Sequence, residues 1–206
     1  MSYTLLFFGT FILIFITIWI KSIIDERSGL KLNSLPDKEI IGFLDAWEKE
    51  LSLHRLGPNS FEGERASGKF KLDVEYGPLG RGGASGYSRR GGAQALQLTI
   101  LAGSIPNFGF GKARLFISTI APLGTRPTSN IIFEERFACA GSEVNILDDV
   151  GQDLLVRGSS SSVNLDLRVL KNYAILHGEW PVNTPPKTSE VADLIDAVLY
   201  LWKRKK

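Results

Sequence analysis

The sequence predicts an α+β protein in which an N-terminal transmembrane helix is followed by one domain, a mostly antiparallel sheet covered by helices on one face. Three observations lead to this prediction. Residues 4–20 form one long apolar run without a charged side chain. Residues 69–76 alternate apolar and charged side chains, the period of two that is typical of a strand with one buried face. Residues 189–203 carry apolar side chains at helical spacing, and helices combined with antiparallel strands define this fold class.

The apolar run is long enough to cross a bilayer. The first charged side chain is Lys21, and residues 4–24 would extend roughly 30 Å as a helix, which matches the hydrocarbon core. The run is also apolar all round, whereas a helix buried in a globular domain has one polar face. We therefore expect residues 1–24 to be a membrane anchor in contact with the lipid bilayer. The expected span includes Leu5, Phe8, Phe11, Ile14, Phe15, Ile18 and Trp19.

A cleaved secretory signal peptide is the alternative interpretation of this segment. Such a peptide has a shorter apolar core and a cleavage site with small residues, but the first alanine of the chain is Ala46. We therefore expect the anchor to be retained. Lys21, Arg27 and Lys31 all follow the span, and positively charged flanks tend to stay in the cytoplasm. The prediction is a single-pass membrane protein with its N terminus outside and its main domain in the cytoplasm.

The rest of the chain is expected to form a juxtamembrane linker, residues 25–35, and one soluble α+β domain, residues 36–206. A domain of about 170 residues can bury a full core without disulfides or metals. The chain has one cysteine, so it cannot form an internal disulfide. Its net charge is only +2, which gives no strong field for nucleic acid. We therefore expect no nucleic-acid partner, no metal and no cofactor.

The first element of this domain is expected to be a helix of about 18 residues that begins at Ser34 and ends before Gly57. Ser34 can serve as the N-cap, Pro36 suits the first turn, and Asp37 complements the positive end of the helix dipole. An apolar stripe follows at helical spacing, formed by Ile40, Leu44, Trp47 and Leu51.

Four strands are expected next, at residues 69–76, 93–102, 112–120 and 130–139. Their connections are too short for helical crossovers, so the strands should pair antiparallel. The alternation within them gives each strand one apolar face and one polar or charged face. The face of the sheet away from the helices should therefore be polar and should meet water or a partner.

The last third of the domain is expected to contain a helix at residues 142–156, a hairpin formed by residues 163–169 and 173–180, and a final helix at residues 189–203. Glu190 lies in the first turn of that final helix and Lys203 in its last turn. This placement of charge complements the helix dipole.

The glycine-rich segment at residues 77–92 is unusual, but it does not match a phosphate-binding loop. Ser85 stands where the G-x-G-x-x-G motif requires its third glycine, and a strand rather than a helix follows. Two interpretations stay open: a long hairpin loop without a ligand, or a basic loop that contacts anionic headgroups or an acidic partner. The contact residues of the second interpretation are Arg81, Tyr87, Arg89 and Arg90.

Two further segments are candidates for contact with a partner or with lipid. Phe108 and Phe110 lie between glycines at residues 103–111, either as a binding tip or as a plug over the core. Lys205 and Lys206 end a basic tail, which is either a second contact with headgroups or a solvated helix end.

The sequence contains no catalytic constellation. His54 continues the stripe of the first helix, and His177 lies alone in a predicted strand. Cys139 has no thiolate-activating context, so we expect a buried, inert thiol. Glu134 and Glu135 fall in a predicted strand, where neighbouring side chains point to opposite faces and cannot share a substrate atom. We therefore assign no catalytic residue.

Together these observations predict a membrane-anchored binding or scaffolding module that interacts with a protein partner in a membrane complex. The alternative is a membrane-tethered enzyme whose site assembles from residues distant in sequence. An enzyme should have a deep pocket in which titratable groups converge. A binding module should instead expose a patch that is suited to a partner.

Overall fold

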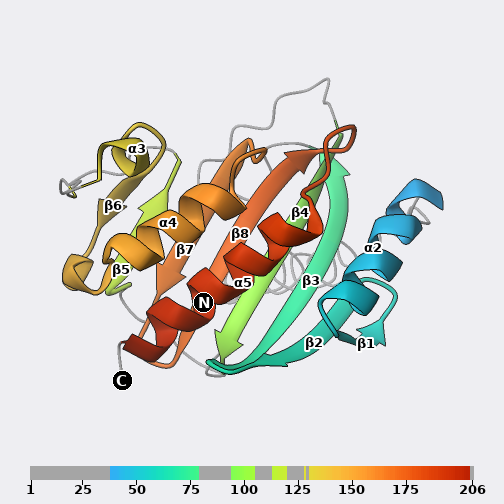
Figure 1. Ribbon diagram of the computed structural model, residues 1–206, viewed down its shortest axis with the longest axis horizontal. Helices are drawn as coiled ribbons and strands as arrows, with labels where there is room; N and C mark the ends of the chain where they lie inside the picture. Colours follow the sequence, from blue (N-terminus) through green and yellow to red (C-terminus); the bar gives the residue numbers. More distant parts are fainter. Residues whose placement is uncertain (1–37, 79–93, 105–112, 120–127, 129, 205–206) are drawn as a thin grey trace, which may run out of the picture. The chain divides into compact units, whose positions relative to one another are not determined.

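The computed structural model describes residues 38–78, 94–104, 113–119, 128 and 130–204 (Figure 1). Contacts divide the chain into two compact units, Met1–Lys38 and Glu39–Lys206, and the second unit is described below. No helix within the described ranges is long and apolar enough to cross a membrane. The span expected at residues 1–24 lies outside the described residues, so it stays a prediction.

Eight strands form one sheet in which every neighbouring pair is antiparallel. The strand order across the sheet is β1-β2-β3-β4-β8-β7-β5-β6. The first four strands are β1 (His54–Gly57), β2 (Ser60–Arg65), β3 (Gly68–Pro78) and β4 (Gln94–Gly103). The other four are β5 (Leu115–Ser118), β6 (Ala138–Ala140), β7 (Asn164–Val169) and β8 (Tyr173–Pro181).

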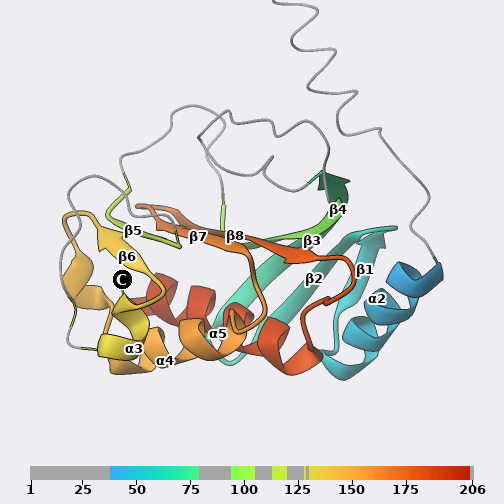
Figure 2. The same cartoon turned by 90° about the horizontal axis from the view of Figure 1, so that it is seen from above.

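The helices lie on one face of this sheet, as Figure 2 shows. They are α2 (Lys38–Glu50), α3 (Ile131–Glu134), the 3-10 turn η1 (Val144–Ile146), α4 (Asp149–Gly158) and α5 (Thr188–Arg204). We call the opposite side, which none of these helices covers, the outer face. The predicted α+β class is confirmed by this arrangement.

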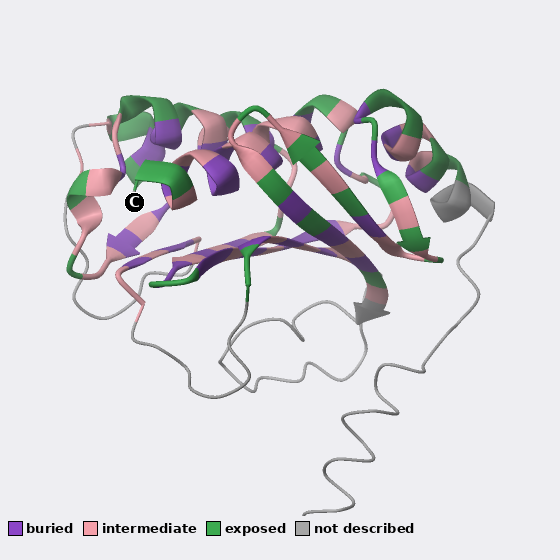
Figure 3. Cartoon of the chain, turned by 90° about the horizontal axis from the view of Figure 1, so that it is seen from below, coloured by how far each residue is buried: buried purple, intermediate pink, exposed green. Residues whose placement is uncertain are grey.

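The core lies between the sheet and the helices. One row of fully buried side chains crosses five neighbouring strands in register: Leu72, Ile100, Leu176, Leu167 and Ile117. The inner side of α5 is buried against the sheet, and Figure 3 shows buried segments along both layers. Because each such side chain contributes about 1.5–3 kcal/mol when it leaves water, this layer fixes the sheet and its register.

Polar contacts tie α4 to α5 on the far side of that core. Asp148, at the start of α4, accepts a hydrogen bond from the Tyr200 hydroxyl at 2.7 Å and pairs with Arg204 near the end of α5. Arg157, in the last turn of α4, pairs with Asp193 at 3.2 Å. The two helices are therefore joined at both ends, and they give the sheet a rigid support.

Several predicted elements are confirmed. The final helix is α5, and the predicted hairpin is formed by β7 and β8. The strands expected at residues 69–76 and 93–102 are β3 and β4; β3 is slightly longer than predicted, and β4 is displaced by one residue. The strand expected at residues 112–120 is β5, which covers only four residues and pairs with β6 and β7.

The strand predicted over residues 130–139 is wrong in its first half. The Asn130 side chain accepts a hydrogen bond from the Phe133 backbone N–H at 3.2 Å, and this N-cap starts the short helix α3. Only β6, at the end of the predicted range, is a strand. Glu134 and Glu135 therefore lie at the end of a helical turn and not on opposite faces of a strand.

The first helix ends earlier than predicted, and a hairpin follows that was not predicted; the expected start at Ser34 lies outside the described residues. Helix α2 ends at Glu50, and Ser52 has a φ of 54°, a left-handed conformation that reverses the chain. Strand β1 begins within the predicted helix, and β2 occupies residues for which no element was predicted. His54 is consequently the exposed first residue of β1 and does not continue the helical stripe.

The helix predicted at residues 142–156 begins later than expected. The carboxylate of Asp148 accepts a hydrogen bond from the Gly151 backbone N–H at 3.1 Å, so Asp148 is the N-cap and α4 begins at Asp149. The residues before it form only the single turn η1.

Candidate functional site

The outer face carries a line of polar side chains that crosses six strands, and we call this line the polar row. Strand register places its members directly opposite one another: Asp73 faces Thr99, Thr99 faces His177, and His177 faces Asp166. Ser60 extends the row on the β2 side, and Ser118 extends it on the β5 side. Their side chains point to the same face because residues directly opposite in a sheet share a face.

Hydrogen bonds join the members of the polar row in pairs. The Ser60 hydroxyl donates to Asp73 at 2.5 Å, and the Ser118 hydroxyl donates to Asp166. Between these pairs, Thr99 Oγ1 lies 2.9 Å from His177 Nδ1. Both carboxylates are thus satisfied by neutral hydroxyl donors, and the imidazole is held by a hydroxyl at one ring nitrogen.

A second cluster on the outer face surrounds the carboxylate of Glu179, which is only 5% exposed. Gln97 donates to one of its oxygens at 3.2 Å, and Asn164 donates to the other at 2.7 Å. A buried carboxylate is tolerated when its oxygens accept hydrogen bonds. The central strands therefore present two hydrogen-bonded polar lines on a face that the described helices leave uncovered.

A third line on the same face combines apolar and positively charged side chains. Lys71 faces Leu101 across β3 and β4, and Arg168 faces Ile175 across β7 and β8. The guanidinium of Arg168 lies over the ring of Phe116, 5.3 Å from its centroid. Among the residues that the structure describes, no hydrogen-bond acceptor and no carboxylate pairs with this guanidinium.

The electrostatic surroundings keep His177 neutral. Burial lowers the pKa of His177, the positive charge of Arg168 lowers it further, and Asp166 acts in the opposite direction. An imidazole with a lowered pKa is uncharged at neutral pH. It can therefore act as a hydrogen-bond acceptor or as a proton acceptor on the outer face.

Acidification is expected to destabilise the folded protein partly through His177. In the unfolded chain this histidine takes up a proton near its ordinary pKa of about 6.5, whereas in the folded state its pKa is lower. Above that pH the group has no effect on the free energy of unfolding. Below it, this free energy falls until the lower pKa of the folded state is reached.

The check is urea unfolding of the wild type and of His177→Gln between about pH 8 and about pH 5. Glutamine can keep a hydrogen bond to Thr99 but does not titrate. The loss of stability on acidification should be smaller in His177→Gln than in the wild type. Equal losses in both proteins would contradict the assignment.

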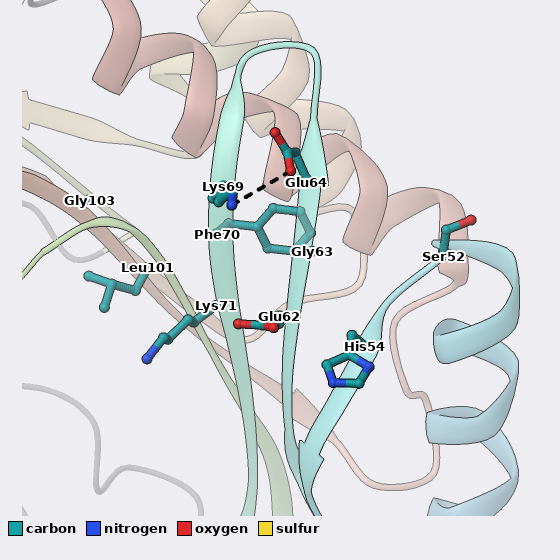
Figure 4. Close-up of a pocket in the computed structure, with 10 residues that line it drawn as sticks. All are labelled: Ser52, His54, Glu62, Gly63, Glu64, Lys69, Phe70, Lys71, Leu101 and Gly103. Atoms are coloured by element: carbon teal, nitrogen blue, oxygen red, sulfur yellow. Dashed lines mark ion pairs between the residues drawn. The ribbon is translucent and has the colours of Figure 1, made fainter.

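An open groove lies beside the polar row and is lined by residues of β1, β2, β3 and β4 (Figure 4). Its volume is about 370 Å³, and His54, Glu62, Lys71 and Leu101 are among its lining residues. Glu64 and Lys69 also line it and approach each other to 3.9 Å. Acidic and basic groups alternate in this groove, and none of the central residues Thr99, His177 or Asp166 lines it.

All of the contact residues predicted from the sequence lie outside the described residues. This applies to Arg81, Tyr87, Arg89, Arg90, Phe108, Phe110, Lys205 and Lys206, and to the expected membrane span. These assignments therefore stay predictions. Arg204, which belongs to the same basic tail, is described and is paired with Asp148.

The structure places His177 at the centre of the polar row, although the sequence alone gave no reason to single it out. The neighbours of His177 on the outer face were also missed from the sequence: Thr99, Asp166, Ser118 and Arg168. Their alternation with apolar neighbours was visible, but the register that brings them together was not. The thiol of Cys139 is buried, as expected. Within the described ranges, no group of three histidine, cysteine or acidic side chains could hold a metal ion.

Comparisons of the chain with protein-family models, with curated proteins and with solved structures found no match.

Proposed function

We propose that this chain is a single-pass, membrane-anchored binding module that recognises a protein partner with the outer face of its sheet. Residues 1–24 would anchor the chain in the bilayer, and residues 25–35 would link this anchor to the α+β domain. The positive residues after the span favour an N terminus outside and a cytoplasmic domain.

The observation that supports this function best is the composition of the outer face. Its central strands carry hydroxyl, imidazole, carboxylate, amide and guanidinium groups, whereas the helices cover only the opposite face. Polar groups fixed by their neighbours on a rigid sheet can recognise a partner with little loss of side-chain entropy. The groove beside them is open rather than a deep pocket, which favours a partner surface over a small substrate.

A charge reversal on this face tests the proposal. The full-length protein would be purified in mild detergent after crosslinking in its native membranes, and the copurifying proteins would be quantified. Lys71 and Glu75 are exposed on the outer face of β3. The double variant Lys71→Glu/Glu75→Lys should reduce the yield of a specific partner at least tenfold, since like charges at an interface cost on the order of 1.4 kcal/mol or more.

The matched control also reverses the charge of one lysine and one glutamate, but on the helix side of the domain. Lys49 is exposed near the end of α2, and Glu134 is exposed in α3. The double variant Lys49→Glu/Glu134→Lys should leave the partner yield unchanged. A partner that is lost in the control and kept in the outer-face variant would contradict recognition through the outer face.

A membrane-tethered enzyme is the second candidate function, and one contact favours it. Thr99 Oγ1 and His177 Nδ1 are 2.9 Å apart, which is the reach of a hydroxyl nucleophile and its general base. Incubation of the full-length protein with a fluorophosphonate probe separates the two functions. Labelling of Thr99 that disappears in His177→Gln would support the enzyme, whereas an unlabelled protein supports the binding module.

A further inference from the structure

We propose that Arg168 and His177 form a binding site for an oxyanion, a carboxylate or phosphate group, at the centre of the outer face. This inference rests on the proposed function and deepens it, because it names the chemistry of the group that the face recognises.

Arg168 and His177 lie on the same face of two neighbouring strands. Arg168 of β7 faces Ile175 of β8, and His177 lies two residues further along β8. Residues in this diagonal relation share a face, and their backbones are about 7–8 Å apart, within reach of long side chains. One oxyanion can therefore contact a guanidinium on one side and an imidazole on the other.

The guanidinium of Arg168 is held in position but has no hydrogen-bond acceptor among the described residues. Its stacking over Phe116, 5.3 Å from the ring centroid, holds it on the sheet. The N–H donors of a guanidinium match the spacing of two oxygens of a carboxylate or phosphate, and Arg168 can therefore bind such a group. The acidic groups nearby are already engaged, since Asp166 accepts from Ser118 and Glu179 accepts from two amides.

His177 uses only one of its two ring nitrogens. Its Nδ1 is hydrogen-bonded to Thr99, and within the described part of the chain no group is hydrogen-bonded to its Nε2. The burial of the ring and the positive charge of Arg168 both lower the pKa of His177. An anion between the two groups would screen the repulsion between the guanidinium and a protonated imidazole, and it would accept a hydrogen bond from the protonated ring. Anion binding and proton uptake should therefore favour each other.

Few other charged side chains of the described strands lie on the outer face near His177. β7 contributes Asp166 and Arg168, and β8 contributes Glu179. Asp73, Lys71 and Glu75 lie on β3, one strand beyond β4, and the outer-face residues of β4 and β5 are uncharged. Arg168 is thus the only cation on a strand adjacent to β8 among the described outer-face residues.

Histidine NMR of the full-length protein tests this site, because the chain contains only two histidines. The protein would be labelled at histidine and held in phosphate-free maltoside micelles. Addition of inorganic phosphate, or of acetate, should raise the titration midpoint of His177 by about one pH unit. The ring resonances of His54, which is exposed at the start of β1, should not shift on addition of either anion beyond the effect of sodium chloride at equal ionic strength.

Two arginine variants decide whether Arg168 is part of the site. In Arg168→Gln, phosphate should no longer move the His177 midpoint, and in Arg168→Lys the response should be reduced. Arg55→Gln is the matched control, because Arg55 also stacks on a phenylalanine, 5.2 Å from the centroid of Phe61, but already pairs with Asp45 and Glu48. In Arg55→Gln, phosphate should move the His177 midpoint as far as it does in the wild type.

Each outcome supports or overturns the site. A response to soluble anions that depends on Arg168 supports it. A response only to mixed micelles with an anionic phospholipid, again dependent on Arg168, also supports it and identifies the group as a lipid headgroup. A response that persists in Arg168→Gln, or no response to any anion, overturns it. The variants of the partner-capture experiment change neither Arg168 nor His177, so the two proposals can fail independently.

Discussion

Replacement of Trp180 by alanine is expected to lower the free energy of unfolding by about 3–5 kcal/mol, the range for the loss of a large buried aromatic side chain. Trp180 is fully buried near the end of β8, in the core between the sheet and the helices. Its ring lies over Gly178 on the same face of the strand, where an added Cβ would come within 2.3 Å of a ring atom. Removal of this ring would therefore leave a cavity beside a residue that has no side chain to fill it.

Denaturant unfolding of the full-length protein, followed by circular dichroism, measures this effect. Gly178→Ala should also be destabilising, because the new methyl group and the Trp180 ring cannot occupy the same space. The combination Gly178→Ala/Trp180→Ala should cost less than the sum of the single changes. Val150→Ala is the control: Val150 is 53% exposed, and its truncation should change stability by less than about 0.5 kcal/mol. If Trp180→Ala cost no more than this control, the described core would be wrong.

The elements that the sequence predicted correctly are those with a strong local pattern. Helix α5 has a continuous apolar stripe and charges that complement its dipole, and β3 alternates without interruption. Elements with a weaker pattern were missed or misassigned. In β2 only Phe61 is buried, so its side chains show no clear alternation. Local patterns fail wherever a segment buries too few residues to display a period.

The misassignment of α3 has a different cause. Ile131 and Ile132 suggest a strand, since β-branched residues are enriched in strands. In the structure these two side chains are 75% and 65% exposed, and the Asn130 cap determines the local conformation instead. A single side-chain hydrogen bond to the backbone can therefore override the apparent strand preference of a pair of residues.

The candidate site was unpredictable for a geometric reason. The alternation of apolar and polar residues correctly indicated a polar outer face. Thr99 and His177, however, are separated by 78 residues, and Ser118 and Asp166 by 48 residues. Their contact depends on the order and register of β4, β8, β7 and β5, which are set by packing against the helices. A sequence pattern gives the face of each side chain but not its neighbour across the sheet.

Deletion of residues 1–24 is expected to move the protein from the membrane pellet to the supernatant. The deleted segment has no charged side chain before Lys21. Central leucine, isoleucine and phenylalanine residues each favour insertion by about 0.3–0.6 kcal/mol, so the run together strongly prefers lipid to water. Ultracentrifugation after alkaline carbonate extraction, without detergent, measures how the wild type and the deletion variant divide between pellet and supernatant.

A point variant at the middle of the expected span distinguishes insertion from peripheral attachment. Ile14→Arg places a charge there, which costs about 2.5–3.5 kcal/mol on the insertion scale, whereas Ile14→Leu costs almost nothing. If the segment spans the bilayer, Ile14→Arg should weaken membrane retention and Ile14→Leu should not. If the domain is held only by its surface, neither change should matter and the deletion should leave the protein in the pellet. Wild-type protein in the supernatant, or a mature chain that lacks this segment, would refute anchoring and with it the membrane location of the outer face.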